Sequence, residues 1–301
     1  MYGSTLYYVR IVQTYDFRRV SVTALIPAFA RGDYTSIPLA REILAFLRSR
    51  GATLSDGPWS EDAARAFAPV FEARFRAVSR VVAEKGATQV LELAAGLSPR
   101  GMDLARKGIV YVEADLAESI TRKREVVTAI LGAVPENLHL CAASAIDRSQ
   151  LVECCGPFVT GRPVAVTTEG LLRYLTFDEK ALVALNVHEI LQRYGGWWIT
   201  PDVHLRSMTQ RQTTDYRQQE RETLGRSLDA NYFEDLDHAR HFFEGLGFVV
   251  ESRPLFERLQ AKIQAPGSDQ AADLNDFRLF VLTPKRVAPH SGLEQRGQLA
   301  V

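Results

Sequence analysis

The sequence predicts an α/β fold in which helices cover a largely parallel sheet. Short β-rich runs alternate with helical stretches of roughly 10 to 17 residues between positions 88 and 203, which indicates strand–helix–strand units. Apolar residues make up 46% and charged residues 24%, as is usual for a globular protein. A length of 301 residues suffices for one large domain with a sizeable core.

The first 85 residues are expected to form a helical cap and N-terminal extension. Residues 21–50 carry apolar side chains near helical spacing, and so does a second stretch from Glu61 to Lys85. Ser60 is suited to cap the second helix and Gly86 to end it.

The core domain is predicted to span residues 86–284, with an inserted polar arm at about 206–230 and a tail at 285–301. Tyr232–Leu246 is predicted to be helical. The last two strands, at 247–252 and 277–283, could be antiparallel neighbours joined by the polar segment 257–276. Within the core we expect strands at 88–93, 109–115, 138–142, 162–169 and 197–203, and helices at 99–107, 118–131 and 178–194.

Composition excludes several classes of protein. The 36 basic and 36 acidic residues give a net charge of zero, without the basic excess typical of nucleic-acid binding. No apolar run reaches the roughly 18 residues that a membrane helix needs, and the first 25 residues lack a signal-peptide core. We therefore expect a cytoplasmic protein without nucleic-acid or membrane partners. The three cysteines form no metal-binding or redox motif and are expected to be reduced thiols, and no metal site is predicted.

The segment Gln89-Val-Leu-Glu-Leu-Ala-Ala-Gly-Leu-Ser-Pro-Arg-Gly101 carries the strongest chemical signal. It reads as a strand, a turn of small residues and the start of a helix, whose free N–H groups favour anionic or polar ligands. Asp115 follows Gly96 by 19 residues, at the end of the next strand. A carboxylate there can hold both ribose hydroxyls of a nucleoside.

The same turn favours S-adenosylmethionine over a dinucleotide. A dinucleotide site uses Gly-x-Gly-x-x-Gly, but Ala94 takes the place of the first glycine and Gly101 is misplaced. Glu92 would repel a pyrophosphate, whereas it suits the cationic sulfonium and ammonium of S-adenosylmethionine. NAD is the second candidate, and a tight turn without a ligand is the structural alternative.

A second cluster follows the fourth predicted strand, in Thr167-Thr-Glu-Gly-Leu-Leu-Arg-Tyr-Leu175. It opens on the same carboxyl edge of the sheet, where open α/β folds bind ligands. Glu169 could face a ligand's ammonium or sulfonium group, and Tyr174 could contact a second substrate. The alternative is that Glu169 caps a helix or pairs with Arg173.

At residues 92–101, 111–116 with Lys123, and 168–175, the sequence resembles the leucine carboxyl methyltransferase family. The nearer branch is the bacterial one, which includes the tetracenomycin polyketide O-methyltransferase. The resemblance covers roughly residues 20–205. It implies a class I, Rossmann-like methyltransferase with a doubly wound, mostly parallel seven-stranded sheet, its last strand antiparallel, and S-adenosylmethionine as cofactor.

The resemblance also implies roles for individual residues. Gly96 would pack against the cofactor beside Ala94, and Asp115 and Leu116 would lie at the ribose. Glu169 would lie at the methionine end, near Glu92. An arginine before the first strand would bind the cofactor's carboxylate; Arg74 matches by position, with Arg76 as competitor. The family's usual aspartate at the adenine is absent, which leaves Ser144 beside Ala145, or Asp147 if the loop is shifted.

The methyl acceptor is less well defined by the sequence. A hydroxyl acceptor benefits from a base, and His204 after the fifth strand is the best-placed histidine, with Asp202 to orient it or to act itself. Tyr174 could contact the acceptor. Met208, Tyr216 and Leu224 in the arm could form a lid, or the arm could be a solvated helix.

We therefore expect an S-adenosylmethionine-dependent O-methyltransferase acting on a hydroxyl or carboxyl of a small molecule of the secondary-metabolite kind. The alternatives are a protein C-terminal carboxyl methyltransferase and a non-catalytic cofactor-binding module. A homodimer is left open.

Overall fold

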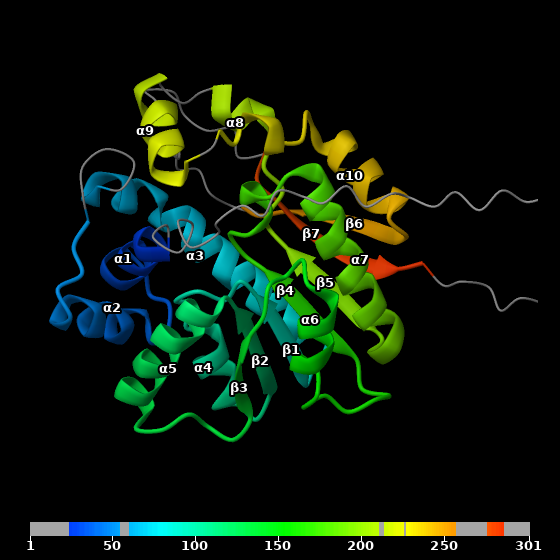
Figure 1. Cartoon of the computed structure of the whole chain (residues 1–301), viewed down its shortest axis with the longest axis horizontal. Coiled ribbons are helices and arrows are strands. Elements are labelled where there is room, and N and C mark those ends of the chain that lie inside the picture. Colours follow the sequence, from blue (N-terminus) through cyan, green and yellow to red (C-terminus); the bar gives the residue numbers. More distant parts are fainter. Residues whose placement is uncertain (1–23, 55–59, 211–213, 226, 257–275, 286–301) are drawn as a thin grey trace, which may run out of the picture.

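The computed structural model describes residues 24–54, 60–210, 214–225, 227–256 and 276–285, and one mixed sheet forms its centre (Figure 1). Its order is β3-β2-β1-β4-β5-β7-β6. Neighbours among the first five strands are parallel, while β7 is antiparallel to both β5 and β6. The strands are β1 (Gln89–Leu93), β2 (Val110–Asp115), β3 (Leu138–Ala142), β4 (Val164–Thr168), β5 (Gly196–Thr200), β6 (Phe248–Pro254) and β7 (Arg278–Pro284).

The predicted fold class is confirmed, including the antiparallel pair at the end of the chain. β6 and β7 pair from Phe248–Pro284 to Pro254–Arg278. The segment 257–275 that joins them lies outside the described residues. The sequence missed one element between β3 and β4, the short helix α6 (Arg148–Cys154), because its polar first turn shows no apolar period.

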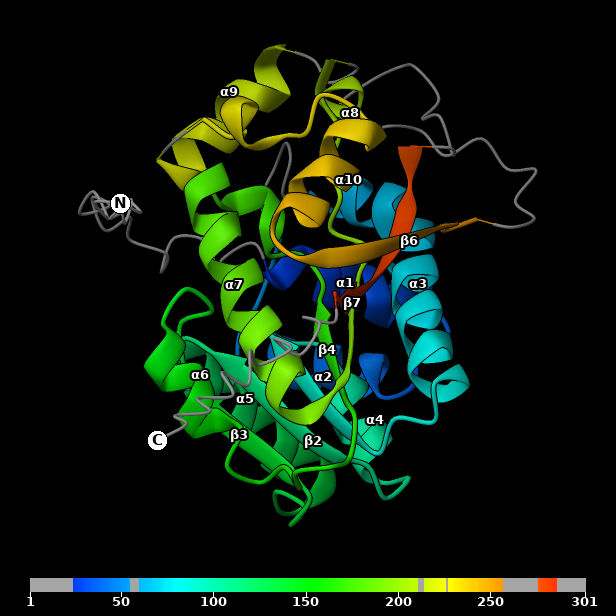
Figure 2. The same ribbon diagram turned by 90° about the vertical axis from the view of Figure 1, so that its right-hand side faces the viewer.

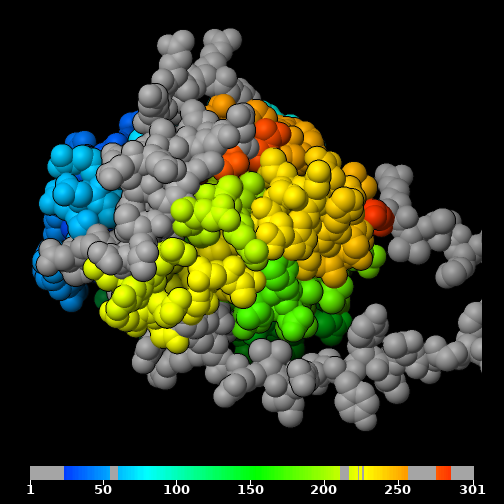
Figure 3. All heavy atoms as spheres, turned by 90° about the horizontal axis from the view of Figure 1, so that it is seen from above, coloured from blue at the N-terminus to red at the C-terminus, as the bar shows by residue number. Residues whose placement is uncertain are grey.

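Helices cover both faces of the sheet (Figure 2). One layer contains α1 (Leu25–Tyr34), α2 (Ala40–Ser49), α3 (Glu61–Glu84), α4 (Arg100–Ala105) and α5 (Ala117–Leu131). The other contains α6 (Arg148–Cys154), α7 (Phe177–Tyr194) and α10 (Leu236–Gly245). The arm holds α8 (Arg206–Gln210) and α9 (Thr214–Leu224) and lies beside α10 on one face (Figure 3).

Helix ends follow the expected capping chemistry. The Ser60 hydroxyl accepts a hydrogen bond from the backbone N–H of Ala63, which caps α3 as predicted. Thr176 and Glu179 form a capping box that starts α7. The helical stretch expected over 21–50 divides into α1 and α2, because the backbone turns at Leu39 with a φ of 63°. Residues 1–23 lie outside the described part.

The alternation of side chains along β1 and β2 directs two carboxylates into the core. Leu91 and Leu93 face α6 and α7, whereas Val90 faces the layer of α1 to α5. Glu92 shares the face of Val90, and Glu113 shares the corresponding face of β2. Both are at most 1% exposed, so each requires a buried partner. No helix in the described part of the chain combines the length and apolar character needed to cross a membrane.

Candidate active site

The strand order places a topological switch point at the carboxyl ends of β1 and β4. The chain moves outward from β1 to β2 and β3 on one side and from β4 to β5 on the other. Connections at such a switch point leave in opposite directions, and ligands bind in the space between them. Ala94, Asp115, Glu169 and His204, predicted from sequence, all follow or end strands at this edge.

The turn after β1 presents its backbone to Asp115. Gly96 donates its N–H to Oδ2 of Asp115 and Leu116 donates its N–H to Oδ1, each at 2.7 Å. Ala94 and Gly96 both have positive φ, of 53° and 50°. A Cβ added to Gly96 would make an ordinary van der Waals contact with the Cβ of Ala24 at 3.8 Å, so the positive φ rather than lack of space favours glycine here.

Asp115 has the chemistry of a ribose ligand. Burial raises the pKa of its carboxyl, and the N–H groups of Gly96 and Leu116 oppose that rise. The Ser119 hydroxyl also bonds to this carboxylate, and the lone pair that the three donors leave is available to a ligand hydroxyl. A turn of small residues beside such a carboxylate fits the nucleoside half of S-adenosylmethionine.

Glu92 lies beneath this turn, with both carboxylate oxygens occupied. Oε1 accepts a hydrogen bond from Nη1 of Arg100, and Oε2 accepts one from the Tyr111 hydroxyl at 2.8 Å. Its predicted contact with the cofactor remains a prediction, since the structure places it within a buried network.

Glu169 does not pair with Arg173 and caps no helix. Its Oε1 accepts a hydrogen bond from Arg31 on α1 at 2.8 Å, and its Oε2 accepts one from Arg100 on α4 at 2.6 Å. Burial favours a raised pKa, but the charges of Arg100, Arg31 and Arg74 outweigh it and lower the pKa of Glu169. Arg173 instead pairs with Glu220 on α9, which holds the arm to this edge.

The structure separates the two candidate arginines on α3. Arg74 is buried and forms an ion pair with Asp202, while its Nε is buried without a hydrogen-bond partner. Arg76 lies on the exposed side, bonded to Glu72 and Ser36. The unsatisfied donor of Arg74 fits a carboxylate ligand such as the methionine end of S-adenosylmethionine.

Asp202 fastens the loop that carries Glu169. Its carboxylate accepts hydrogen bonds from the backbone N–H groups of Gly170, Leu171 and Leu172. It therefore ties the end of β5 to the end of β4. The carboxylate does not orient His204 as expected; the backbone oxygen of Asp202 lies 3.3 Å from Nδ1 of that histidine.

His204 and Tyr174 lie where the arm meets the sheet edge. Burial, followed by the charges of Arg173 and Arg74, lowers the pKa of His204 to about 3. Its ring centroid lies 6.3 Å from that of Tyr232. Tyr174 is buried in a cluster with Leu224, Leu228 and Tyr232, so this part of the arm is packed rather than solvated. Met208 packs against the main core, and the side chain of Tyr216 lies outside the described residues.

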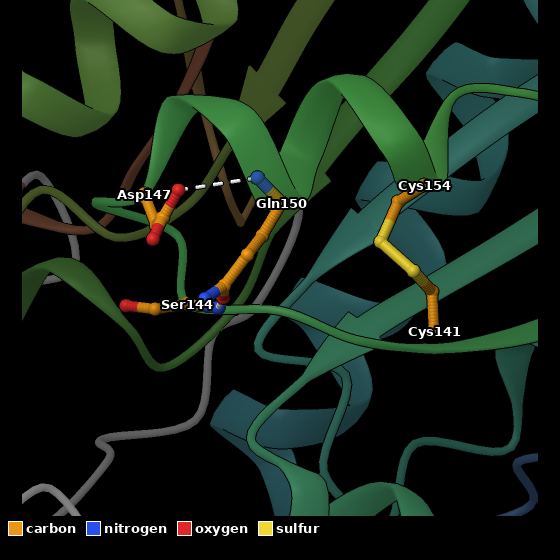
Figure 4. Close-up of a disulfide and its surroundings, with 5 residues drawn as sticks. All are labelled: Cys141, Ser144, Asp147, Gln150 and Cys154. Atoms are coloured by element: carbon orange, nitrogen blue, oxygen red, sulfur yellow. Dashed lines mark hydrogen bonds between the residues drawn. A yellow bond between two sulfur atoms is a disulfide. The ribbon is translucent and has the colours of Figure 1, made fainter.

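The loop after β3 carries both Ser144 and Asp147, and the choice between them at the adenine remains a prediction (Figure 4). The Asp147 carboxylate caps α6 by accepting the N–H of Gln150 at 3.1 Å and the Ser149 hydroxyl at 2.7 Å. Gln150 reaches back and accepts the N–H of Ser144 at 2.8 Å. The carbonyl of Ala145 accepts a hydrogen bond from Asn186, which fixes the loop against α7.

The expectation of three reduced thiols is wrong for two of them. Cys141 on β3 and Cys154 on α6 form a disulfide, with Cα atoms 5.7 Å apart (Figure 4). Cys155 is free and buried. The sequence argument considered adjacent cysteines, whereas the fold brings together two that are 13 residues apart.

Sequence reasoning missed Arg31 and Arg100 as members of the site. Arg31 lies 138 positions from its partner Glu169, and no local pattern connects them. Arg100 did carry a signal. It is the first residue of α4, where the helix dipole disfavours a cation, so its presence there called for a specific anionic partner.

Comparisons with known proteins bear on the family and the fold. The family model of the leucine carboxyl methyltransferases matches residues 39–187, which include Arg74, Asp115 and Glu169. No curated protein matches the chain.

Solved structures show the same fold. A DUF574 family protein from Streptomyces avermitilis has a TM-score of 0.54 and 16% identity, covering 88% of this chain and 97% of its own. A candidate methyltransferase from Thermobifida fusca has a TM-score of 0.53 and 17% identity, covering 88% and 94%. The match over residues 39–187 and the geometry of the strand ends indicate an S-adenosylmethionine-dependent methyltransferase that is similar to the leucine carboxyl methyltransferase family.

Proposed function

We propose that the protein transfers a methyl group from S-adenosylmethionine to a hydroxyl or carboxyl oxygen of a small, secondary-metabolite-like acceptor. The observation that carries the proposal is the position of His204. It follows β5 at the switch-point edge, two residues after Asp202, whose carboxylate is bonded to the loop following Glu169. This position supports the proposal because it brings an imidazole near the loop that carries Glu169, the residue predicted for the methionine end.

The cofactor-side residues form three groups in this proposal. Asp115, with Leu116, Ala94 and Gly96, holds the ribose. Ser144 and Ala145 border the adenine. Arg74 binds the methionine carboxylate, for which its buried Nε is an available donor, and Glu169 faces the cationic end, with Glu92 beneath it.

The bound cofactor supplies an electrophilic methyl group on a cationic sulfur, so catalysis depends mainly on positioning. His204 is neutral near pH 7, because the pKa of its imidazolium is lowered to about 3. Its Nδ1 lies beside the Asp202 carbonyl, which leaves Nε2 to take a hydroxyl proton as the oxygen–carbon bond forms and the carbon–sulfur bond breaks. Tyr174 borders the acceptor from the η3 turn (Leu172–Tyr174).

Because His204 is a weak base, the rate of methyl transfer should depend mainly on the acidity of the acceptor group. An acceptor that is already a carboxylate needs no base, whereas an alcohol or phenol must lose its proton. We therefore expect His204→Gln to reduce kcat for a hydroxyl acceptor and to leave kcat for a carboxylate acceptor nearly unaffected.

Incubation with methyl-labelled S-adenosylmethionine tests the proposal. The enzyme is supplied separately with the small-molecule fraction and the protein fraction of a bacterial lysate. Label is expected in small molecules, and mild base distinguishes esters, which release methanol, from ethers. Label found in protein, or in neither fraction while wild type binds the cofactor, would overturn it. Asp115→Ala is the matched control that should abolish labelling.

A further inference from the structure

Arg100 lies beside the switch point, and each of its three guanidinium nitrogens donates a hydrogen bond. Its side chain is not exposed. Nη1 donates to Glu92, Nη2 donates to Glu169 at 2.6 Å, and Nε donates to the Ser79 hydroxyl at 3.3 Å. The guanidinium also stacks on Phe75, 4.7 Å from the ring centroid.

The two carboxylates that Arg100 joins belong to the two strands of the switch point. Glu92 lies on β1, and Glu169 directly follows β4. β1 and β4 are neighbours in the sheet, and the connections after them diverge. One buried, planar side chain thus joins the two strands beneath the edge at which the cofactor is expected to bind.

The orientation of the Glu169 carboxylate is fixed from both sides. Arg31 on α1 binds one oxygen and Arg100 on α4 binds the other. Two guanidinium groups from different helices leave the carboxylate little freedom to rotate. The remaining lone pairs of both oxygens then point in set directions.

We propose that Arg100 is a positioning residue for methyl transfer, which bridges Glu92 and Glu169 and so holds the Glu169 carboxylate toward the cationic end of S-adenosylmethionine. The inference rests on the proposed contact between Glu169 and the cofactor. A purely structural role would be the neutralisation of buried Glu92, whose other oxygen is bonded to Tyr111. The two roles predict different behaviour when Glu92 is neutralised together with Arg100.

The decisive variant is Arg100→Met combined with Glu92→Gln. It removes one positive and one negative charge, and the new amide can still accept the Tyr111 hydrogen bond. Glu169 keeps Arg31 but loses the cation that contributes most to its low pKa. We expect S-adenosylmethionine to bind this variant at least 10-fold more weakly at pH 7.5, as measured by isothermal titration calorimetry.

A pH series separates positioning from structural support. Arg31 on α1, Arg74 on α3, Arg100 on α4 and Glu92 on β1 are the charged groups around Glu169. Without Arg100 the pKa of Glu169 rises, so the affinity of the variant relative to wild type should fall further between pH 7.5 and 5.5. Titration of the ligand itself is common to both proteins and cancels in the ratio.

Matched variants complete the test. Phe243→Leu, a core substitution between α10 and the sheet, should lower stability without the 10-fold loss of affinity. Arg100→Lys restores a charge but cannot bridge both carboxylates, so binding should stay weakened while its pH dependence returns toward wild type. Arg100→Lys also serves if the double variant does not fold.

The outcomes separate the inference from the function on which it rests. If wild type does not bind S-adenosylmethionine, or Glu169→Gln binds it normally, the cofactor assignment fails. If wild type binds, Glu169→Gln is impaired, and a folded Arg100 variant stays within two-fold of wild type at every pH, the positioning role of Arg100 is refuted.

Discussion

Gly101→Ala tests the packing that supports the site. Gly101 lies in the first turn of α4, where that helix packs on β2. An added Cβ would lie 2.1 Å from Oε1 of Glu113 and 3.1 Å from Cδ1 of Leu138. Glu113 would have to move, although its Oε2 lies 2.9 Å from Nζ of buried Lys123.

The expected cost follows from that ion pair. Breaking a buried pair costs about 3–5 kcal/mol when a charge is left unpaired. Alanine returns about 1 kcal/mol because its helix propensity exceeds that of glycine. Burial raises the pKa of Glu113 to about 7, so protonation can relieve part of the loss. We therefore expect Gly101→Ala to lower the free energy of unfolding by about 2–4 kcal/mol.

Urea denaturation at pH 8 measures this change, with Gly245→Ala as control. Gly245 is the last residue of α10, and no atom lies within 4 Å of an added Cβ. The control should gain between zero and about 1 kcal/mol. If Gly101→Ala proves as stable as Gly245→Ala, the explanation of this glycine by close packing is refuted.

Three further predictions concern other parts of the chain. Ala94→Gly should raise the free energy of unfolding by about 1 kcal/mol in urea titrations, because a non-glycine residue with φ of 53° is strained; a loss would contradict this. Cys154→Ser should lower the free energy of unfolding by about 3 kcal/mol under non-reducing conditions, and alkylation of the wild-type protein followed by mass spectrometry should find one free thiol, Cys155, rather than three. The pKa of His204 is about 3 in the folded protein and 6.5 when unfolded, so the unfolded state binds the extra proton between these values. Stability should therefore fall as pH drops from 6.5 toward 3, by up to about 1.4 kcal/mol per pH unit from this group, and His204→Gln should show a shallower slope.

The parts of the fold that could be predicted are those with strong local signals. The strands around Val90 and Val112 are short, fully buried apolar runs, and such runs are typical of strands at the centre of a sheet. Gly96 and Asp115 were identified because a small-residue turn and a carboxylate at the next strand end are set by chain geometry. Helix α6 was missed because its polar first turn shows no apolar period. It begins at the Asp147 cap, and the disulfide of Cys154 joins it to β3.

The partners of the site residues could not be predicted, because they depend on tertiary contacts between distant segments. Arg74 and Asp202 are 128 residues apart, and Arg31 and Glu169 are 138 apart. The sequence suggested Arg173 as the partner of Glu169 because it is near in the chain. The η3 turn instead directs Arg173 toward Glu220 in the arm.

The buried charges at the switch point balance each other, as the charges of the whole chain do. Arg31, Arg74 and Arg100 are paired there with Glu92, Glu169 and Asp202, so three positive charges balance three negative ones in a buried cluster. A buried ion that loses its partner costs several kcal/mol, whereas a neutralised pair need not. A single charge-removing substitution at this site therefore changes stability and ligand binding together. Charge-balanced pairs of substitutions, compared with a destabilising core substitution away from the site such as Phe243→Leu, can separate the two.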